Sequence, residues 1–223
     1  LINNINATSV SCNGLNNGSI SLTTFLGTAG YFYSLNGGAN QYNANGSYSF
    51  NNLSPGSYTV DVEDINGCTY IGNPILITIT QPAVLTASIQ QTATSWFSGN
   101  DGSATVLPSG GTSPYSYSWS NGSVNQSATG LTTGLYTCTI TDANGCIVTQ
   151  SITVTQPPSA LSISTSSSDV SCNGGNNGSA TISVGGGTPG YSYSWINGAS
   201  TSTINGLSTG FYNGRQILKQ KSQ

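Results

Sequence analysis

SCNGLNNGSISLTTFLGTAGYFYSL, at residues 11–35, opens a pattern that recurs as SWFSGNDGSATVLPSGGTSPYSYSW at 95–119 and SCNGGNNGSATISVGGGTPGYSYSW at 171–195. Each copy contains a polar Asn/Gly loop, an alternating segment from Gly-Ser, a turn rich in glycine, and a second alternating segment. Alternation of apolar and polar residues predicts half-buried β-strands. Recurrence of the whole pattern predicts an array of similar modules.

The segments that follow each copy extend the module. The first two copies continue into a strand, an Asp-x-Asn-Gly hairpin turn at 64–67 and 142–145, and a final strand that ends at Gln-Pro. We therefore predict modules at 1–83, 84–158 and 159–212. The third module stops matching after Tyr212, so we expect it to be incomplete and 213–223 to be an unrelated basic tail.

Many short strands with regular turn signals are typical of β-sandwiches, and no stretch before residue 214 has helical periodicity. The predicted fold is all-β, with tandem sandwich modules. The joints at Pro82 and Pro157 are short and favour extended geometry, which predicts a rod of modules.

The composition excludes several classes of function. Charged residues make up 4% of the chain, there is no histidine, and the only bases are Arg215, Lys219 and Lys221. Residues 1–214 carry no cation that could neutralise phosphates, so we expect no nucleic-acid binding. No apolar run approaches 18 residues, so we expect no membrane insertion.

General acid–base catalysis also lacks its usual residues. Histidine is absent, and the aspartates and glutamate never form a repeated pair. The prediction is a protein that is not an enzyme and has no catalytic residues, no metal and no cofactor.

The repeated motifs together resemble a known family. SCNGGNNGSATISVGGGTPGYSYSWING at 171–198 and TGLYTCTITDANGC at 133–146 look like the SprB-type repeat, which occurs in tandem in large cell-surface adhesins of gliding Bacteroidetes. The resemblance covers residues 1–212 and implies immunoglobulin-like (Ig-like) β-sandwiches, export to the cell surface, and a role in adhesion or gliding. Trp96 replaces the first cysteine of the second module, and Leu35 replaces tryptophan in the first.

An exported setting favours disulfides. Cys12 and Cys68 occupy matching ends of the first module, so we predict a bond between them. Cys146 has lost its matching partner to Trp96, and two interpretations of Cys138 stay open: a bond to Cys146 or a small buried residue. An extended hairpin separates Cys138 from Cys146 by about 10–13 Å, beyond the usual Cα limit of about 7 Å, which favours the second.

The aromatic rows also have two interpretations. Three aromatic residues alternate in the second and third copies, so each row faces one side of its strand; they are Tyr115, Tyr117, Trp119, Tyr191, Tyr193 and Trp195. Exposed rows could stack sugars of surface glycans. We favour the other interpretation, that they form the core of each sandwich.

A calcium site is the remaining candidate. The Asp-x-Asn-Gly turns mimic the start of a calcium loop but lack an acidic ligand at its twelfth position. Turn geometry explains both motifs, while Asp61, Glu63 and Asp64, expected to face outward together, keep a weak surface calcium site open.

The leading functional hypothesis is a structural and adhesive array in an extracellular adhesin or fibre, with copies of itself or neighbouring repeats as partners. One alternative is a filament subunit joined by strand complementation, in which residues 1–10 of one copy complete the third module of another. The other is an array of carbohydrate-binding modules.

Overall fold

The computed structural model describes residues 2–69, 72 and 74–217, and these residues form β-strands and turns with no helix. The chain divides into two compact units. The first comprises Leu1–Ile89, Val106–Gln126 and Thr137–Gln150, and the second comprises Gln90–Thr105, Ser127–Tyr136 and Ser151–Gln223. The boundary therefore passes through the second predicted module, and the three predicted modules stay a prediction.

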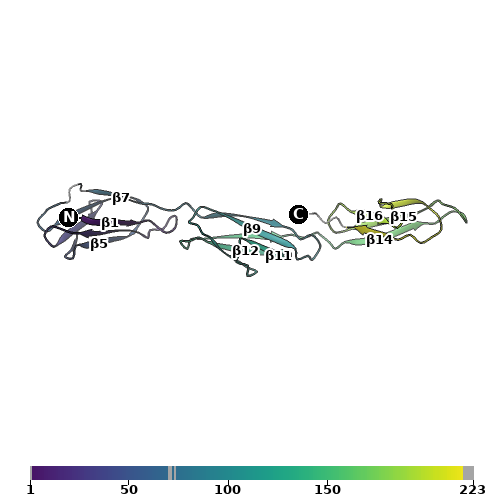
Figure 1. Ribbon diagram of the computed structural model, residues 1–223, viewed down its shortest axis with the longest axis horizontal. Helices are drawn as coiled ribbons and strands as arrows, with labels where there is room; N and C mark the ends of the chain where they lie inside the picture. The colour runs from purple at the N-terminus through teal and green to yellow at the C-terminus, as the bar shows by residue number, and fades with distance from the viewer. Residues whose placement is uncertain (1, 70–71, 73, 218–223) are drawn as a thin grey trace. The chain divides into compact units, whose positions relative to one another are not determined.

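The N-terminal part of the first unit is a sandwich of two antiparallel sheets (Figure 1). One sheet has the order β1-β2-β5 and the other β4-β3-β6-β7. The bounds are β1 (Ile2–Thr8), β2 (Gly18–Thr24), β3 (Tyr31–Leu35), β4 (Gln41–Asn43), β5 (Ser47–Leu53), β6 (Gly56–Asp64) and β7 (Ile75–Ile79).

The alternation read from the sequence builds the core of this sandwich. Inward residues of both sheets form a buried cluster, and partly buried residues such as Ile2, Ile5 and Phe50 pack against it. The buried set is Val10, Ile20, Leu22, Tyr31, Tyr33, Leu53, Val60, Val62 and Ile79.

The connections and one side-chain contact make this sandwich Ig-like. The chain crosses between sheets after β2, β4 and β5, as in Greek-key sandwiches. Tyr58, near the start of β6, donates a hydrogen bond of 2.8 Å to the carbonyl of Ser54. This is the tyrosine corner of Ig-like domains, and Tyr136 and Tyr212 repeat it with the carbonyls of Thr132 and Ser208.

The second predicted module contributes strands to both units. They are β8 (Thr86–Thr92), β9 (Gly102–Ser109), β10 (Ser116–Trp119), β11 (Ser127–Leu131), β12 (Gly134–Thr141) and β13 (Ile147–Val154), in the orders β11-β9-β8 and β10-β12-β13. In the first unit, Trp119 of β10 pairs with Cys138 of β12.

The C-terminal part of the second unit contains β14 (Ser162–Ser168), β15 (Gly178–Gly185), β16 (Ser192–Trp195), β17 (Thr203–Leu207) and β18 (Gly214–Ile217). Its core is Ile182, Trp195, Ile204 and Leu207. Strand β18 pairs with β16, although the sequence pattern predicted no strand there. Residues 218–223, the rest of the predicted tail, lie outside the described residues. No helix in the described part of the chain is long and apolar enough to cross a membrane.

Candidate functional site

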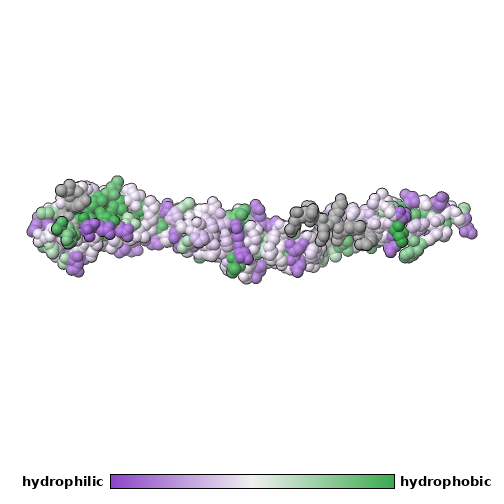
Figure 2. Space-filling model, in the orientation of Figure 1, coloured by the Kyte–Doolittle hydropathy of each residue, from purple (hydrophilic) through white to green (hydrophobic). Residues whose placement is uncertain are grey.

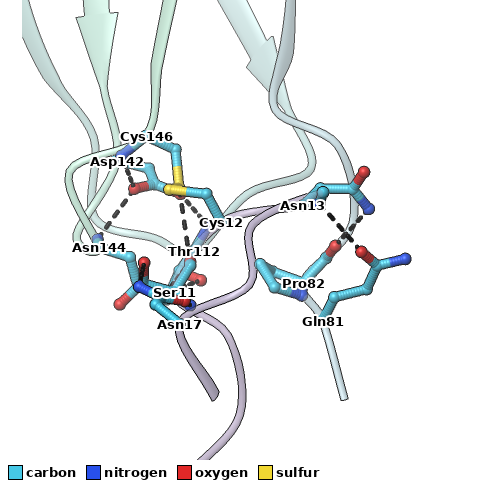
Figure 3. Close-up of a disulfide and its surroundings, with 11 residues drawn as sticks. Ser11, Cys12, Asn13, Asn17, Gln81, Pro82, Thr112, Asp142, Asn144 and Cys146 are labelled. Carbon is cyan, nitrogen blue, oxygen red and sulfur yellow. Dashed lines mark hydrogen bonds between the residues drawn. A yellow bond between two sulfur atoms is a disulfide. The ribbon is translucent and has the colours of Figure 1, made fainter. Parts of the chain in front are cut away.

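A disulfide joins two loops that lie far apart in the sequence (Figure 3). Cys12 and Cys146 are 134 residues apart and their Cα atoms are 5.7 Å apart. Both belong to the first unit, Cys12 in the first predicted module and Cys146 in the second. We call the surrounding residues, 11–17, 81–85 and 142–147, the joint.

The Cys12 side of the joint is a polar loop held to the start of the inter-module linker. Asn17 accepts a hydrogen bond from the backbone of Ser11 and donates one to its hydroxyl. Asn13 donates to the carbonyl of Pro82 at 3.0 Å, and the backbone of Gly14 donates to the side chain of Gln81 at 3.0 Å. The Ser-Cys-Asn-Gly motif therefore positions Cys12 by hydrogen bonding to the Gln81-Pro82 linker.

The Cys146 side is the Asp142 turn. The carboxylate of Asp142, 5% exposed, accepts backbone hydrogen bonds from Asn144 and Cys146 on Oδ1 and from Thr112 on Oδ2. Burial raises the pKa of this carboxyl, but the backbone donors outweigh it and hold the pKa below its ordinary value. The ionised Asp142 therefore fixes the turn that presents Cys146.

One side chain spans the joint beside the disulfide. The amide of Asn144 donates to the carbonyl of Ser11 at 2.9 Å and to the hydroxyl of Thr112 at 3.0 Å (Figure 3). The Sγ atom of Cys146 lies 3.5 Å from the same carbonyl. A depression of about 370 Å³ lies at the joint, lined by residues from both loops and by Ala83, Val84 and Leu85 of the linker.

The loop that carries Cys12 falls within a segment that matches a known protein family. The SprB repeat matches residues 4–40, 97–124 and 164–200. These three segments are SprB repeats. Such repeats occur in cell-surface proteins, which is consistent with an extracellular location. No curated protein matches the chain.

Solved structures with a similar course of the chain are distant in sequence. A C-terminal fragment of intimin, solved in complex with the intimin-binding domain of the translocated intimin receptor, has 14% identity and a TM-score of 0.41, and the match covers 74% of this chain and 66% of that fragment. The N-terminal eight Ig domains of the Down syndrome cell adhesion molecule have 15% identity and a TM-score of 0.32, and the match covers 91% of this chain and 31% of that one. A tetra-tandem repeat from the extending region of a large adhesion protein has 17% identity and a TM-score of 0.24, and the match covers 93% of this chain and 63% of that one.

The predicted Cys12–Cys68 bond is wrong, because Cys12 is bonded to Cys146 and Cys68 is a free, exposed thiol. The reason is the direction of β2. Cys12 precedes β2, whereas the turn of Cys68 bonds to Thr28, beyond the other end of this strand. Seven residues of strand separate the two ends by about 20 Å, far beyond disulfide reach.

The alternative Cys138–Cys146 bond is also wrong. Cys138 is a free thiol with no exposed surface, and it lies opposite Trp119 in the pairing of β10 and β12. Burial raises the pKa of its thiol. Cys138 is therefore a small buried core residue, and its buried thiol is unreactive.

The aromatic rows contribute to the cores. Trp119 is 3% and Trp195 is 6% exposed, and their indole nitrogens donate to the carbonyls of Asn125 and Thr201. The tyrosines of both rows are half-buried, namely Tyr115, Tyr117, Tyr191 and Tyr193. A flat, exposed platform for sugars is therefore not formed by these rows.

The expected outward cluster of Asp61, Glu63 and Asp64 is wrong for its third member. Side chains alternate along β6, so Asp64 is buried while Asp61 and Glu63 are partly exposed on the other face. Hydrogen bonds from the backbones of Cys68, Thr28 and Asn66 occupy its carboxylate and lower its pKa. Among the described residues no group of three or more His, Cys, Asp or Glu is placed to hold a metal ion.

The motifs did not predict that Ser11, Gln81 and Asn144 lie in the joint, or that Thr112 bonds to it. One signal was present, since the second module keeps the cysteine of its turn, Cys146, but has Trp96 in place of the cysteine of its loop. A turn cysteine without a loop cysteine in the same module indicates that its partner lies in another module.

Proposed function

We propose that this chain is a non-enzymatic structural and adhesive repeat array in a cell-surface adhesin or an extracellular fibre. The observation that carries the proposal is the Cys12–Cys146 bond, which joins two successive predicted modules outside the backbone. When such a chain is pulled from its ends, force passes through the disulfide, and the residues between the two cysteines cannot extend. The bond therefore suits a protein that bears tension between a cell and a surface.

Single-molecule pulling tests this role. With the bond intact, the segment between Cys12 and Cys146 stays short, and a reducing agent should release it and add about 450 Å of contour length. The matched control replaces Cys68 and Cys172, the two exposed free cysteines, with serine and should give the same traces as the original chain. Equal contour length with and without reductant would show that the bond carries no force.

The surface supports adhesion through many weak contacts that depend little on charge. A hydrophobic patch, green in Figure 2, covers the part of the first unit where Figure 1 places β7. On this strand Leu76 is 69% exposed, and Ile75 and Ile77 are partly exposed. Apolar contacts are not screened by salt, whereas contacts between exposed charges are. Exposed apolar patches commonly mark interaction sites.

Bead adhesion tests the contact chemistry. Beads coated with the chain should adhere to an apolar surface equally well at low and high salt, and Leu76→Ser should weaken this adhesion. Leu135→Ser is the matched control, because Leu135 is equally exposed, at 68%, but lies on β12. Adhesion that disappears in high salt, or that is the same for both variants and the original chain, would contradict the proposed mechanism.

Strand complementation is a second candidate, favoured by a groove in the second unit. A cavity of about 500 Å³ is lined by residues of β14, β15 and β17 and by Trp195. In the earlier repeats a Cβ atom on Gly18 or Gly102 would meet the last strand, at Ile79 or Val154, at 2.7 Å, whereas the nearest side chain to a Cβ atom on Gly178 is the upstream Val170, at 3.4 Å. The groove thus matches the course of β7 and β13 in the earlier repeats.

The donor proposed from the sequence fits less well. Ile2–Thr8 form β1, which pairs with β2 and packs on the core of its own sandwich, so donating it would dismantle that edge. A peptide with the sequence of β13, Ile147–Val154, should bind the groove, and one with its residues scrambled should not. Deleting residues 1–10 tests the original donor, since polymerisation of the shortened chain would exclude it.

Glycan binding requires exposed aromatic rings outside the two buried rows. Trp96 is 50% and Phe97 is 39% exposed in the second unit. A glycan that binds there should shift the fluorescence of Trp96, and this shift should disappear in Trp96→Ala. Unchanged emission across the glycans of a host or substrate surface would leave the adhesive role with protein or apolar partners.

A further inference from the structure

The five cysteines fall into three groups. Cys12 and Cys146 are bonded to each other, and Cys138 is buried in a core. Cys68 and Cys172 are both exposed free thiols. Cys68 occupies the turn position that Cys146 has in the joint, and Cys172 occupies the loop position that Cys12 has. The chain therefore carries one complete joint and two separate, complementary halves of a second one.

The turn of Cys68 is built like that of Cys146. Asp64 accepts the backbone hydrogen bonds of Asn66 and Cys68 on one oxygen and that of Thr28 on the other, as Asp142 does for its own turn. Asn66 donates to the hydroxyl of Thr28 at 2.7 Å, which matches the bond from Asn144 to Thr112. In the complete joint, the side-chain amide of Asn144 also donates to the carbonyl of Ser11.

The loop of Cys172 is likewise a copy of the loop of Cys12. The backbone of Ser171 donates to Asn177 at 3.0 Å, and Asn177 donates back to the hydroxyl at 2.8 Å. The corresponding distances between Ser11 and Asn17 are 3.1 and 2.8 Å. Asn66 of a second copy could donate a hydrogen bond to the carbonyl of Ser171, as Asn144 donates to the carbonyl of Ser11.

We propose that Cys172 of one copy of this chain forms a disulfide with Cys68 of a second copy, in a joint of the same design as Cys12–Cys146. The independent support is the complete joint itself, in which the same loop motif and the same turn motif are bonded to each other. In the complete joint, the repeat that supplies the loop precedes the repeat that supplies the turn. The same order is kept when the last repeat of one copy, with Cys172, is followed by the first repeat of the next copy, with Cys68. Copies joined in this way form a heterologous, head-to-tail chain.

The bond forms by two thiol–disulfide exchanges. The Cys68 thiolate attacks oxidised glutathione and forms a mixed disulfide, releasing one glutathione thiolate. The Cys172 thiolate of the second copy then attacks the Cys68 sulfur and releases the second. The two protein thiols lose two electrons and two protons in total, and one molecule of oxidised glutathione is reduced to two of glutathione.

The test incubates the full chain with oxidised glutathione and follows it by non-reducing electrophoresis. The expected result is a ladder of oligomers that reductant collapses. Residues 1–214 contain no lysine or arginine for trypsin to cut, so pepsin digestion at low pH, where disulfides do not exchange, followed by mass spectrometry should find Cys68 joined to Cys172.

Two variants give the test its specificity. Cys68→Ser retains only the loop half and Cys172→Ser only the turn half, so each alone should stay monomeric and their mixture should give dimers and nothing longer. Because both residues are exposed, both variants should melt like the original chain. Asn66→Ala should slow cross-linking by about three- to tenfold, which is the effect of one hydrogen bond.

Several results would overturn the inference. Dimers of Cys172→Ser alone or of Cys68→Ser alone would show unspecific pairing of exposed thiols. A monomer with Cys68 bonded to Cys172 in the same chain, or a chain that stays reduced and monomeric, would each exclude a joint between copies. An unchanged rate for Asn66→Ala would show that the two halves do not dock as they do in the Cys12–Cys146 joint.

Discussion

Replacing Cys12 and Cys146 together with serine should lower the free energy of unfolding of the first unit. In the chain-entropy description, a disulfide stabilises by restricting the unfolded chain, and a separation of 134 residues corresponds to about 5 kcal/mol. If the first predicted module unfolds alone, the loop runs only from Cys12 to the Pro82 linker, about 70 residues, and the effect is about 4.4 kcal/mol. Measured losses are commonly about 2–4 kcal/mol.

Urea denaturation measures this loss; tryptophan fluorescence reports on the second and third predicted modules, which contain all three tryptophans, and tyrosine fluorescence includes the first. The double variant should unfold at lower urea than the oxidised chain, and reductant should move the original chain to the position of the variant. Cys68→Ser with Cys172→Ser is the control and should not shift the curve, because both thiols are exposed and unbonded.

The reasoning fails if the double variant and the oxidised chain unfold at the same urea concentration. It fails equally if peptide mapping of the oxidised chain finds Cys12 bonded to Cys68. A loss confined to one module would instead show that the two modules unfold independently, and its size should then approach the smaller of the two values.

Three further predictions concern single side chains. Because the pKa of Asp142 is lowered in the fold, the stability that its carboxylate contributes is complete above the unfolded pKa of about 3.9 and is lost as pH falls through the folded pKa. When the free energy of unfolding is measured against pH, Asp142→Asn should therefore lose less stability in acid than the original chain. Trp119→Ala should cost about 3–5 kcal/mol as a buried large-to-small change, and acrylamide should quench Trp119 far less than the half-exposed Trp96. Tyr58→Phe removes the hydrogen bond to Ser54 and should cost about 0.5–1.5 kcal/mol in thermal or urea unfolding.

Much of the fold follows from the sequence because its causes are local. Alternation along Tyr115–Trp119 places the three aromatic rings on one side of a strand, and a sandwich needs bulky residues there, so the burial of Trp119 was predictable. The Asp-x-Asn-Gly motif likewise dictates its own turn, because the Asp142 carboxylate reaches backbone donors only two and four residues away.

The misplaced details depend on contacts between distant segments. Asp64 has the inward parity of Val60 and Val62, but its charge favoured an outward position. The backbone donor of Thr28, which helps to satisfy the buried carboxylate, lies 36 residues away in the sequence. Strand β18 forms from a segment unlike its counterparts, because the edge of β16 supplies the backbone hydrogen bonds that a strand needs whatever its side chains.

The amino-acid sequence by itself determined the repeated pattern, the all-β class, the inward rows and the turns, since each arises from side-chain alternation and hydrogen bonds within a few residues. Only the tertiary structure decided which cysteines meet. Cys12 and Cys68 lie at opposite ends of a strand about 20 Å long, while the loop of the first predicted module and the turn of the second share the same joint. Disulfide pairing depends on this placement of strand ends, which the order of residues along the chain does not disclose.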